Sequence, residues 1–156
     1  MVEYCKETKT EMMKMTRLEK AKDILQSGNH TCVICNGEDV HTTELRGVKP
    51  LVQWLKSGID FGGCYAADKV VGKGAGFLYV LLGARAVYAG VISKPALDLL
   101  QCHGIDVVFE KLVDNIINRQ GTGICPFEQA VSHIDDAQKA YSAILQKMEE
   151  MNISID

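Results

Sequence analysis

Apolar and polar positions at the start of the chain follow first a helical and then a strand period. Residues 16–28 carry one apolar stripe at helical spacing, formed by Leu18, Ala21, Ile24 and Leu25. We expect Thr16 to cap this helix and Gly28 to end it. Residues 31–45 then alternate in the manner of a β-hairpin, with Asn36-Gly37 as a strong signal for its two-residue turn.

Beyond the hairpin, short helices alternate with short strands. We expect helices over 47–57, 73–82 and 94–103, and strands over 61–71, 85–92 and 105–110, with a further extended piece at 112–118. Apolar residues recur at helical spacing from 126 to 151, which predicts one long amphipathic helix. Strands that alternate with helices are typical of a mostly parallel sheet covered on both faces. The predicted fold class is α/β, a three-layer α/β/α sandwich with a mixed sheet.

Length and charge narrow the picture. The chain has 156 residues, which fits one domain. We expect a flexible tail over 1–15, where charges show little apolar periodicity, and a single domain over 16–156 that includes the long C-terminal helix. Seventeen basic and twenty acidic residues give a net charge of −3. This balance argues against a nucleic-acid partner, because phosphate recognition normally needs a basic excess on one face.

The cysteines and the most apolar stretch bear on the compartment. Six cysteines without a signal-peptide pattern indicate reduced thiols, so we expect a cytoplasmic protein. The stretch 75–92 is long enough for a membrane span, but Arg85 and three glycines interrupt it. We interpret it as a buried helix followed by a buried strand, and we expect no membrane partner.

Ligands of open α/β sheets gather where strands lead into helices. The first such junction contains Asp68 and places Lys73 between Gly72 and Gly74 at a helix start. Glycines let an anion approach the backbone and the lysine adds a positive charge, so the junction predicts a site for an anionic or polar group. It matches neither the P-loop nor the dinucleotide fingerprint. Close helix packing, with Lys73 reaching solvent, explains the same residues equally well.

Two further junctions add candidates. Ser93-Lys94 precedes the next predicted helix, and a glycine-rich loop leads into Cys125. Cys125 with Glu128 three residues later has the layout of a capping box with a thiol in the capping position, where a thiolate nucleophile forms more easily. The alternative is a small, buried packing residue. The predicted catalytic residues are Cys125 and Lys73, and the predicted ligand-binding residues are Asp68, Gly72, Gly74, Ser93, Lys94, Arg119, Thr122, Gly123 and Glu128.

No motif indicates a metal or another cofactor. Cys32 and Cys35 have C-x-x-C spacing, but they lie in an apolar strand, where residues three apart point to opposite faces. No second Cys or His pair with metal-finger spacing follows them. We therefore expect no metal and no cofactor.

The order of helix, hairpin, and alternating helices and strands is similar to that of the cytidine-deaminase-like superfamily. The residues that carry a closer resemblance, to an uncharacterised domain family grouped with that superfamily, are ADKVVGKGAG at 67–76, YAGVISKPAL at 88–97 and INRQGTGICPFEQAV at 117–131. The resemblance covers most of the chain after the N-terminal tail and implies a cytidine-deaminase-like topology.

The resemblance does not extend to the zinc chemistry. Zinc deaminases take one ligand from an H-x-E or C-x-E motif and two from P-C-x-x-C. Here Lys73 occupies the first junction. If Pro95 stands for the proline of the second motif, Ala96 and Leu99 stand where its cysteines would be. Without these ligands and the proton-shuttling Glu, a metal-bound hydroxide cannot form. The resemblance supports the fold and argues against the deaminase reaction.

Three hypotheses for this protein of unknown function remain open. The leading one is small-molecule binding, to a nucleotide-like or anionic metabolite, at the helix N-termini of a zinc-less deaminase-like fold. An alternative is a non-zinc enzyme that uses Cys125 and Lys73. A further alternative is a non-catalytic oligomeric scaffold or interaction protein. Self-association into a homodimer or higher oligomer is compatible with each, since related folds commonly form such assemblies.

Overall fold

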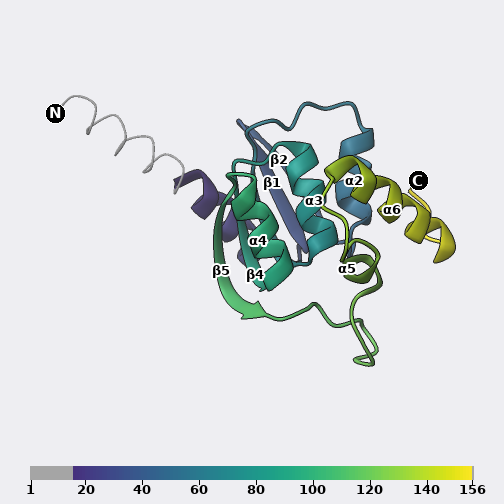
Figure 1. Ribbon diagram of the computed structural model, residues 1–156. Helices are drawn as coiled ribbons and strands as arrows, with labels where there is room; N and C mark the ends of the chain where they lie inside the picture. The colour runs from purple at the N-terminus through teal and green to yellow at the C-terminus, as the bar shows by residue number, and fades with distance from the viewer. Residues whose placement is uncertain (1–15, 156) are drawn as a thin grey trace.

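The structure is a computed structural model that describes residues 16–155 (Figure 1). A helix over residues 16–27 precedes a hairpin of β1 (Cys32–Asn36) and β2 (Asp39–Thr43). The following elements are α2 (Lys49–Lys56), β3 (Tyr65–Val71), α3 (Lys73–Leu82), β4 (Ala86–Ser93), α4 (Lys94–Cys102), β5 (Asp106–Val113), α5 (Pro126–Ala130) and α6 (Ala137–Glu150). The expected tail over 1–15 lies outside the described residues.

The strands form one mixed sheet in the order β2-β1-β3-β4-β5. β1 pairs antiparallel with both β2 and β3, whereas β3, β4 and β5 are mutually parallel. The predicted α/β class with a mixed sheet is confirmed. The register places Asp68 of β3 between Cys32, the first residue of β1, and Ala89 of β4. Asp68 is therefore the paired residue of β3 that lies nearest the carboxyl edge of the sheet on the β1 side.

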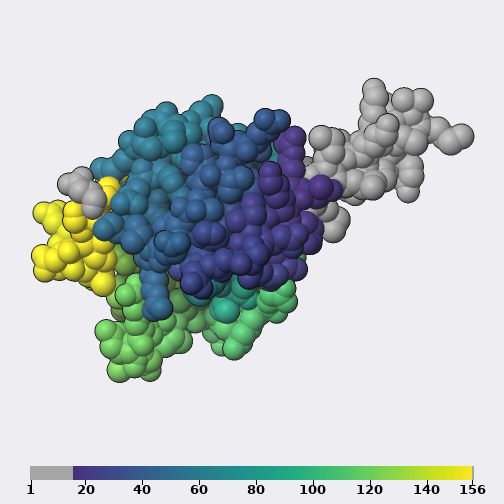
Figure 2. Space-filling model, turned by 180° about the vertical axis from the view of Figure 1, so that it is seen from behind, coloured from purple at the N-terminus to yellow at the C-terminus, as the bar shows by residue number. Residues whose placement is uncertain are grey.

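Helices cover the two faces of the sheet unequally. The larger core lies under α2, α3, α4, α5 and α6, and its fully buried side chains include Phe77, Leu78, Ile144 and Met148. On the opposite face, the helix over 16–27 buries Leu18, Ala21 and Leu25 against the sheet. Figure 2 shows this helix, in purple, at the surface when the molecule is seen from behind. The face that carries α3 and α4 is also the face toward which Asp68 points, because its carboxyl contacts Tyr79 of α3.

The hairpin forms as predicted, with its turn displaced by one residue. Asn36 pairs with Asp39, so the two loop residues are Gly37 and Glu38. Gly37 has a φ of 63°, a left-handed conformation that glycine adopts without the steric penalty of a side chain. The glycine thus opens the loop, and Asn36 remains in the strand.

The C-terminal prediction of one long helix is wrong. The chain forms α5 and α6, which residues 131–136 separate. Asp136 caps α6, since its side chain accepts a hydrogen bond from the backbone nitrogen of Lys139 at 3.1 Å. Val131 is fully buried between the two helices, so the apolar spacing continues across the break and conceals it.

Of two smaller expectations, one is wrong and the other is confirmed. Thr16 is itself helical, so it does not cap the first helix as predicted, although that helix does end before Gly28. The stretch 75–92 forms most of α3 and β4, as interpreted. Within residues 16–155, no helix combines the length and the apolar character that crossing a bilayer requires.

Candidate functional site

A buried carboxylate joins three segments at the carboxyl edge of the sheet. Glu128 of α5 is 3% exposed. Its Oε2 accepts hydrogen bonds from the backbone nitrogen of Lys73, at 2.6 Å, and from Ser93 Oγ, at 2.7 Å. Its Oε1 accepts from the backbone nitrogen of Ile116 at 2.7 Å. The start of α3, where the sequence predicted an external anion, therefore already has a carboxylate from the same chain.

The glycines around Lys73 serve this close approach. A Cβ on Gly72 would lie 2.8 Å from Glu128 Oε2, and a Cβ on Gly74 would lie 3.3 Å from Phe127 Cβ. Both glycines thus let α5 pack tightly against the start of α3. The packing interpretation, which the sequence left open, agrees with these distances.

The predicted capping box at Cys125 is wrong. Cys125 is the residue before α5, but its side chain makes no capping hydrogen bond. Glu128 bonds to the other segments and not back to Cys125. The thiol is partly buried and packs against the larger core. Cys125 therefore has the environment of a packing residue, and the helix that it precedes is only five residues long.

Lys73 and Lys94 have partners of their own. Lys73 Nζ donates to the backbone oxygen of Ser132 at 3.1 Å and lies 5.7 Å from the ring centre of Phe77. Lys94 Nζ lies 2.9 Å from Asp114 Oδ1. The hydrogen bond of this exposed pair, and then the attraction of the opposite charges, raises the pKa of Lys94 and lowers the pKa of Asp114. Lys94 therefore contacts the segment that follows β5, and Lys73 contacts the segment that follows α5.

The glycine-rich loop between β5 and α5 is held by its own hydrogen bonds. Ile117 and Ile124 form a β-bridge. The backbone nitrogen of Thr122 donates to Asn118 Oδ1 at 3.0 Å, and Asn118 Nδ2 donates to Thr122 Oγ1 at 3.1 Å. In Figure 1 the loop projects away from the helices. Arg119 and Gly123 lie in this exposed loop. The hydrogen bonds of Thr122 are with Asn118 of the same loop and not with Lys73.

A second polar cluster, which the sequence analysis did not assemble, surrounds Asp68. The Tyr79 hydroxyl of α3 donates to Asp68 Oδ2 at 2.6 Å, and the backbone nitrogen of Val70 donates to Asp68 Oδ1 at 3.2 Å. Cys32 Sγ of β1 lies 3.1 Å from the Tyr79 hydroxyl oxygen. Since the single Tyr79 hydrogen points to Asp68, that oxygen accepts the Cys32 S–H. We call Cys32, Asp68 and Tyr79 the Asp68 cluster.

The Asp68 cluster has unusual acid–base properties. Burial raises the pKa of Asp68 to about 6, and this effect outweighs the hydrogen bonds, that from Tyr79 first, that favour the charged form. Burial also raises the pKa of Tyr79 and of Cys32 well above their usual values, and the Asp68 charge adds to both shifts. At neutral pH the cluster is therefore a carboxylate that accepts from the neutral Tyr79 hydroxyl, which in turn accepts from the neutral Cys32 thiol.

Sequence reasoning named Asp68 but missed Cys32 and Tyr79. One signal was present: Tyr79 is the polar exception in an otherwise apolar stretch of α3, and Asp68 is the acidic exception in an apolar strand. The separation of Cys32 from Tyr79 along the chain, 47 residues, explains the omission. Their meeting depends on how β1 packs under α3.

The remaining cysteines and acids do not form a metal site with this cluster. Cys32 and Cys35 belong to separate core clusters on opposite faces of the sheet, as predicted. Within residues 16–155, no three His, Cys, Asp or Glu side chains come close enough together to hold a metal ion.

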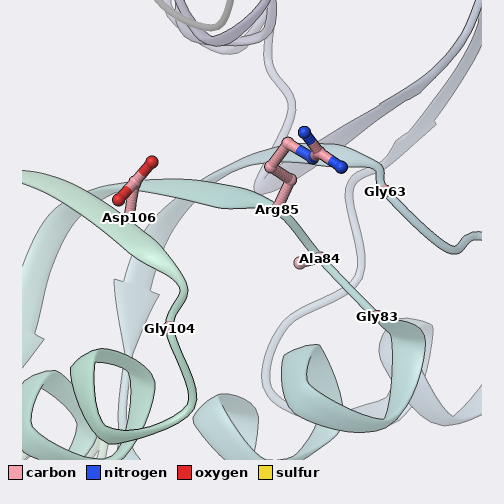
Figure 3. Close-up of a pocket in the computed structure, with 6 residues that line it drawn as sticks. All are labelled: Gly63, Gly83, Ala84, Arg85, Gly104 and Asp106. Carbon is pink, nitrogen blue, oxygen red and sulfur yellow. The ribbon is translucent and has the colours of Figure 1, made fainter. Parts of the chain in front are cut away.

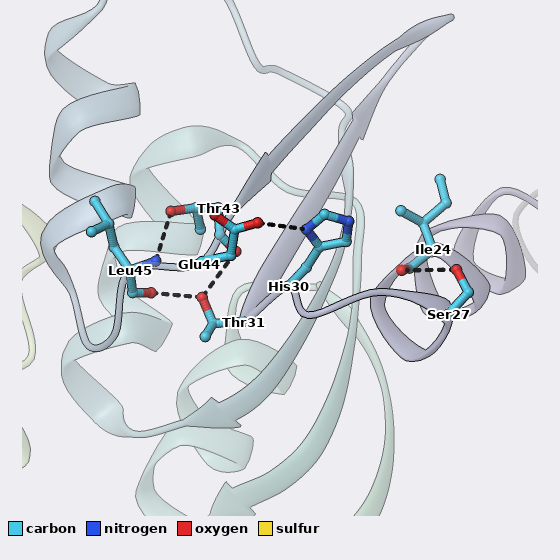
Figure 4. Close-up of polar contacts among 7 residues, drawn as sticks. All are labelled: Ile24, Ser27, His30, Thr31, Thr43, Glu44 and Leu45. Atoms are coloured by element: carbon cyan, nitrogen blue, oxygen red, sulfur yellow. Dashed lines mark hydrogen bonds and ion pairs between the residues drawn. The ribbon is translucent and has the colours of Figure 1, made fainter.

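A network beside Asp68 fixes the chain that follows β2 (Figure 4). Thr31 Oγ1 donates to the backbone oxygens of Thr43, at 3.1 Å, and Leu45, at 2.6 Å. The backbone oxygen of Thr31 accepts from the backbone nitrogen of Lys69 at 3.1 Å. His30 Nδ1 lies 3.9 Å from Glu44 Oε1. The contacts of Thr31 with Thr43 and Leu45 hold the start of β1 against the end of β2, and the Lys69 bond holds it against β3, next to Asp68.

A cavity of about 330 Å³ lies at the opposite, amino edge of the parallel strands. Figure 3 shows its lining residues, Gly63, Gly83, Ala84, Arg85, Gly104 and Asp106. Its backbone donors are already bonded within the chain: Gly63 to Gly83 at 2.8 Å, and Arg85 to Cys64 at 2.8 Å. None of the predicted site residues lines this cavity.

The sequence matches a protein family over most of its length. The model for the family described as "Domain of unknown function (DUF1893)" matches residues 20–148. The chain belongs to the DUF1893 family. A crystal structure of a DUF1893 family protein from Thermotoga maritima is similar to this DUF1893 chain, with a TM-score of 0.78 and 27% sequence identity. The similarity covers 85% of this chain and 90% of the other. No curated protein matches it.

The comparison bears on the fold and leaves the function open. The Thermotoga maritima protein shares the architecture of this DUF1893 chain, and the family description assigns no activity. Any function must therefore be argued from the two polar clusters themselves.

Proposed function

We propose that this DUF1893 chain binds a small molecule beside Asp68, on the face of the sheet that carries α3. The observation that carries the proposal is a half-buried carboxyl with unused acceptor capacity. An ionised carboxylate offers about four lone-pair positions, and the hydrogen bonds from Tyr79 and Val70 take one position on each oxygen of Asp68. The group is thus oriented in advance, which reduces the entropy lost when a ligand binds.

The Glu128 contacts refine which predicted residues would touch the ligand. The donors at the start of α3 and the Ser93 hydroxyl already serve Glu128. We assign Gly72, Gly74, Ser93 and Glu128 to shaping the edge of the site, and Asp68 to direct contact.

A deaminase-like topology is part of the proposal. The order of helix, antiparallel hairpin, and alternating helices and parallel strands supports it. A nucleotide-like ligand follows only by analogy with that fold, so the proposal commits to a small polar molecule and leaves nucleosides and nucleotides as members of the test panel.

The contacts of Cys125 and Lys73 favour binding over catalysis by that pair. The Cys125 thiol packs against the core, whereas the Lys73 amine is directed to the Ser132 carbonyl. A nucleophile needs a base within hydrogen-bond reach, and neither side chain has the other as its partner. The enzyme alternative therefore draws less support from the geometry than the binding proposal.

One observation favours the scaffold alternative as a second candidate. β5 ends the sheet, and it exposes Val108 by 48%, Phe109 by 39% and Leu112 by 38%. Exposed edge strands with apolar side chains are templates for pairing with another chain. Light scattering coupled to gel filtration tests it: a monomer at high micromolar concentration would remove this candidate.

A thermal-shift screen tests the binding proposal. The full chain is screened with nucleosides, nucleotides, amines and sugar phosphates, alongside Asp68→Asn and the exposed-residue control Asp98→Asn. A ligand at a hundred times its dissociation constant stabilises the folded state by about 2.7 kcal/mol. We expect a stabilising compound that acts on the wild type and on Asp98→Asn but not on Asp68→Asn. A panel without any stabilising compound, or one whose effect survives Asp68→Asn, contradicts the proposal.

A further inference from the structure

We propose that Asp68 recognises a planar, positively charged nitrogen group on the bound molecule, of the amidine or guanidine class, with Tyr79 and Cys32 as its positioning residues. This inference rests on the proposed function and names the chemistry of its ligand. The supporting observations are the geometry and the charge around Asp68: its carboxylate has no cationic partner within residues 16–155.

Asp68 has uncharged neighbours on α3 and β1. Tyr79 and Cys32 are neutral donors, and they lie on the two elements packed against the carboxyl, α3 and β1. Among the ion pairs formed within residues 16–155, none involves Asp68. A half-buried carboxylate without a cationic partner is costly to desolvate.

The lysines near this edge are directed elsewhere. Lys73, on the same helix as Tyr79, donates to Ser132, and Lys94 pairs with Asp114. Lys69 follows Asp68 in β3 and is exposed, and neighbouring residues of a strand point to opposite faces. The compensating charge would therefore come from the ligand.

The raised pKa of Asp68 agrees with this account. Burial is its largest cause, and no cation lowers the pKa in opposition to it. A ligand cation would favour the ionised form and so lower the pKa of Asp68 when it binds. Recognition would be strongest above a pH of about 6, where the free carboxyl is ionised.

The hydrogen bonds that Asp68 accepts from Tyr79 and Val70 favour a planar cationic group on the ligand. Tyr79 occupies one lone pair on Oδ2, and Val70 occupies one on Oδ1. We place two parallel N–H donors of the ligand on the second position of each oxygen, in bidentate geometry. An amidinium or guanidinium presents those donors in one plane, whereas an ammonium approaches as a point charge. A metal ion is a poorer fit, since no third ligating side chain joins Asp68 and Cys32 within the described residues.

Acetamidine and its neutral counterpart acetamide form a matched pair of probes. The full chain is labelled with ¹³C, and the carboxyl signal of Asp68 is followed by NMR while each probe is added. We expect acetamidine to shift that signal at pH 7 and to lower the pKa of Asp68, while acetamide does neither. The acetamidine affinity should fall about tenfold for each pH unit below about 6, because protonation removes the charge.

Variants separate contact from positioning. Asp68→Asn should abolish the acetamidine response elsewhere in the spectrum, whereas Asp98→Asn should leave it unchanged. Tyr79→Phe removes a donor without changing the shape of the core, and it should raise the pKa of Asp68 and weaken acetamidine binding. Tyr141→Phe on α6 is its control, and a purely structural role for Tyr79 would leave the pKa of Asp68 unmoved.

The outcomes distinguish this inference from the proposed function. Equal responses to acetamide and acetamidine, or an acetamidine response that survives Asp68→Asn, overturn the inference. If compounds in the metabolite panel perturb Asp68 without dependence on their charge, the binding proposal stands and the charge selectivity is wrong. If nothing in the panel perturbs Asp68, both fail together.

Discussion

The carboxylate of Glu128 lies 2.6 Å from the backbone nitrogen of Lys73, although the two residues are 55 positions apart in the chain. Glu128 thus does for α3 what a capping side chain does within a helix: it satisfies a backbone donor that the first turn leaves free. The same carboxylate reaches the Ser93 hydroxyl and the Ile116 nitrogen. One side chain therefore locks α5 onto the starts of α3 and α4.

Replacing Glu128 should destabilise the fold strongly. Glu128→Ala leaves three donors without an acceptor in a buried place, and each such group costs about 1–3 kcal/mol. We expect a loss of roughly 3 kcal/mol or more in the free energy of unfolding, measured with urea. Glu128→Gln keeps one acceptor oxygen and should lose less. Glu149→Gln, at an exposed position on α6, is the control. Equal stabilities for Glu128→Ala and the wild type would contradict the role assigned to this carboxylate.

Gly72→Ala tests the same contact from the other side. The added methyl group would lie 2.8 Å from Glu128 Oε2, so the carboxylate must move. We expect a loss of about 1–3 kcal/mol. Gly123→Ala, where a Cβ meets nothing within 4 Å, should be close to neutral. In a double-mutant cycle, the penalty of Gly72→Ala should shrink when Glu128 is already alanine. Additive penalties would show that the two residues do not interact.

The raised pKa of Asp68 predicts a specific pH dependence. The folded-state pKa, about 6, lies above the usual value of 3.8, so the folded protein binds the proton more tightly than the unfolded chain. The stability that this proton supplies is fully present below a pH of about 4. It is lost as the pH rises through about 6. Asp68→Asn should therefore flatten the profile between these limits, by an amount on the order of 2 kcal/mol.

Urea unfolding at several pH values measures this effect. The difference in unfolding free energy between Asp68→Asn and the wild type should favour the variant more at pH 7.5 than at pH 4. Asp98→Asn should follow the wild-type profile throughout. Parallel profiles for Asp68→Asn and the wild type would mean that burial does not raise the pKa of Asp68.

The cysteines should react in order of their exposure. Cys102 is exposed, Cys125 is intermediate, and Cys32, Cys35 and Cys64 are buried. Burial raises the pKa of Cys64 to about 12, which leaves little thiolate to react. Among these five cysteines, we expect iodoacetamide to modify Cys102 first and the buried thiols only on unfolding, as followed by peptide mass spectrometry. A Cys125 that reacts faster than Cys102 would restore the nucleophile hypothesis.

Asp136 should stabilise the start of α6. Its side chain accepts the Lys139 backbone hydrogen at 3.1 Å, and losing such a cap typically costs about 1 kcal/mol. Asp136→Ala should lower the urea midpoint accordingly. The neighbouring Asp135→Ala has the same charge change without the cap and should have a smaller effect. Equal effects from both variants would attribute the loss to charge instead.

The elements between Gly72 and Gly83 illustrate what local patterns could predict. The helix was expected over 73–82, and α3 spans Lys73–Leu82. Gly83 has a φ of 77° at its C-terminal end, a conformation that favours glycine and so marks the boundary in the sequence. The prediction failed at the break between α5 and α6, because the apolar spacing continues through the buried Val131. Asp136 looked like one more polar position on a continuing helix.

Glu128 shows the same division at the level of the site. Its spacing from Cys125 fits a local capping box, yet its carboxylate is bonded to Lys73, Ser93 and Ile116. A local pattern records which contacts are within reach along the chain. It does not record which distant donor lies closer once the chain has packed.

The sequence by itself determined the alternation of helices and strands, the α/β class and the candidacy of Asp68, because steric preferences and burial periodicity act between near neighbours. Only the tertiary structure decided that Glu128 bonds to α3 and that Cys32 and Tyr79 surround Asp68. Those partners lie tens of residues apart in most cases, and their distances depend on how the sheet and its helices pack. The charge environment of Asp68, on which the proposed ligand chemistry rests, exists only in that packed arrangement.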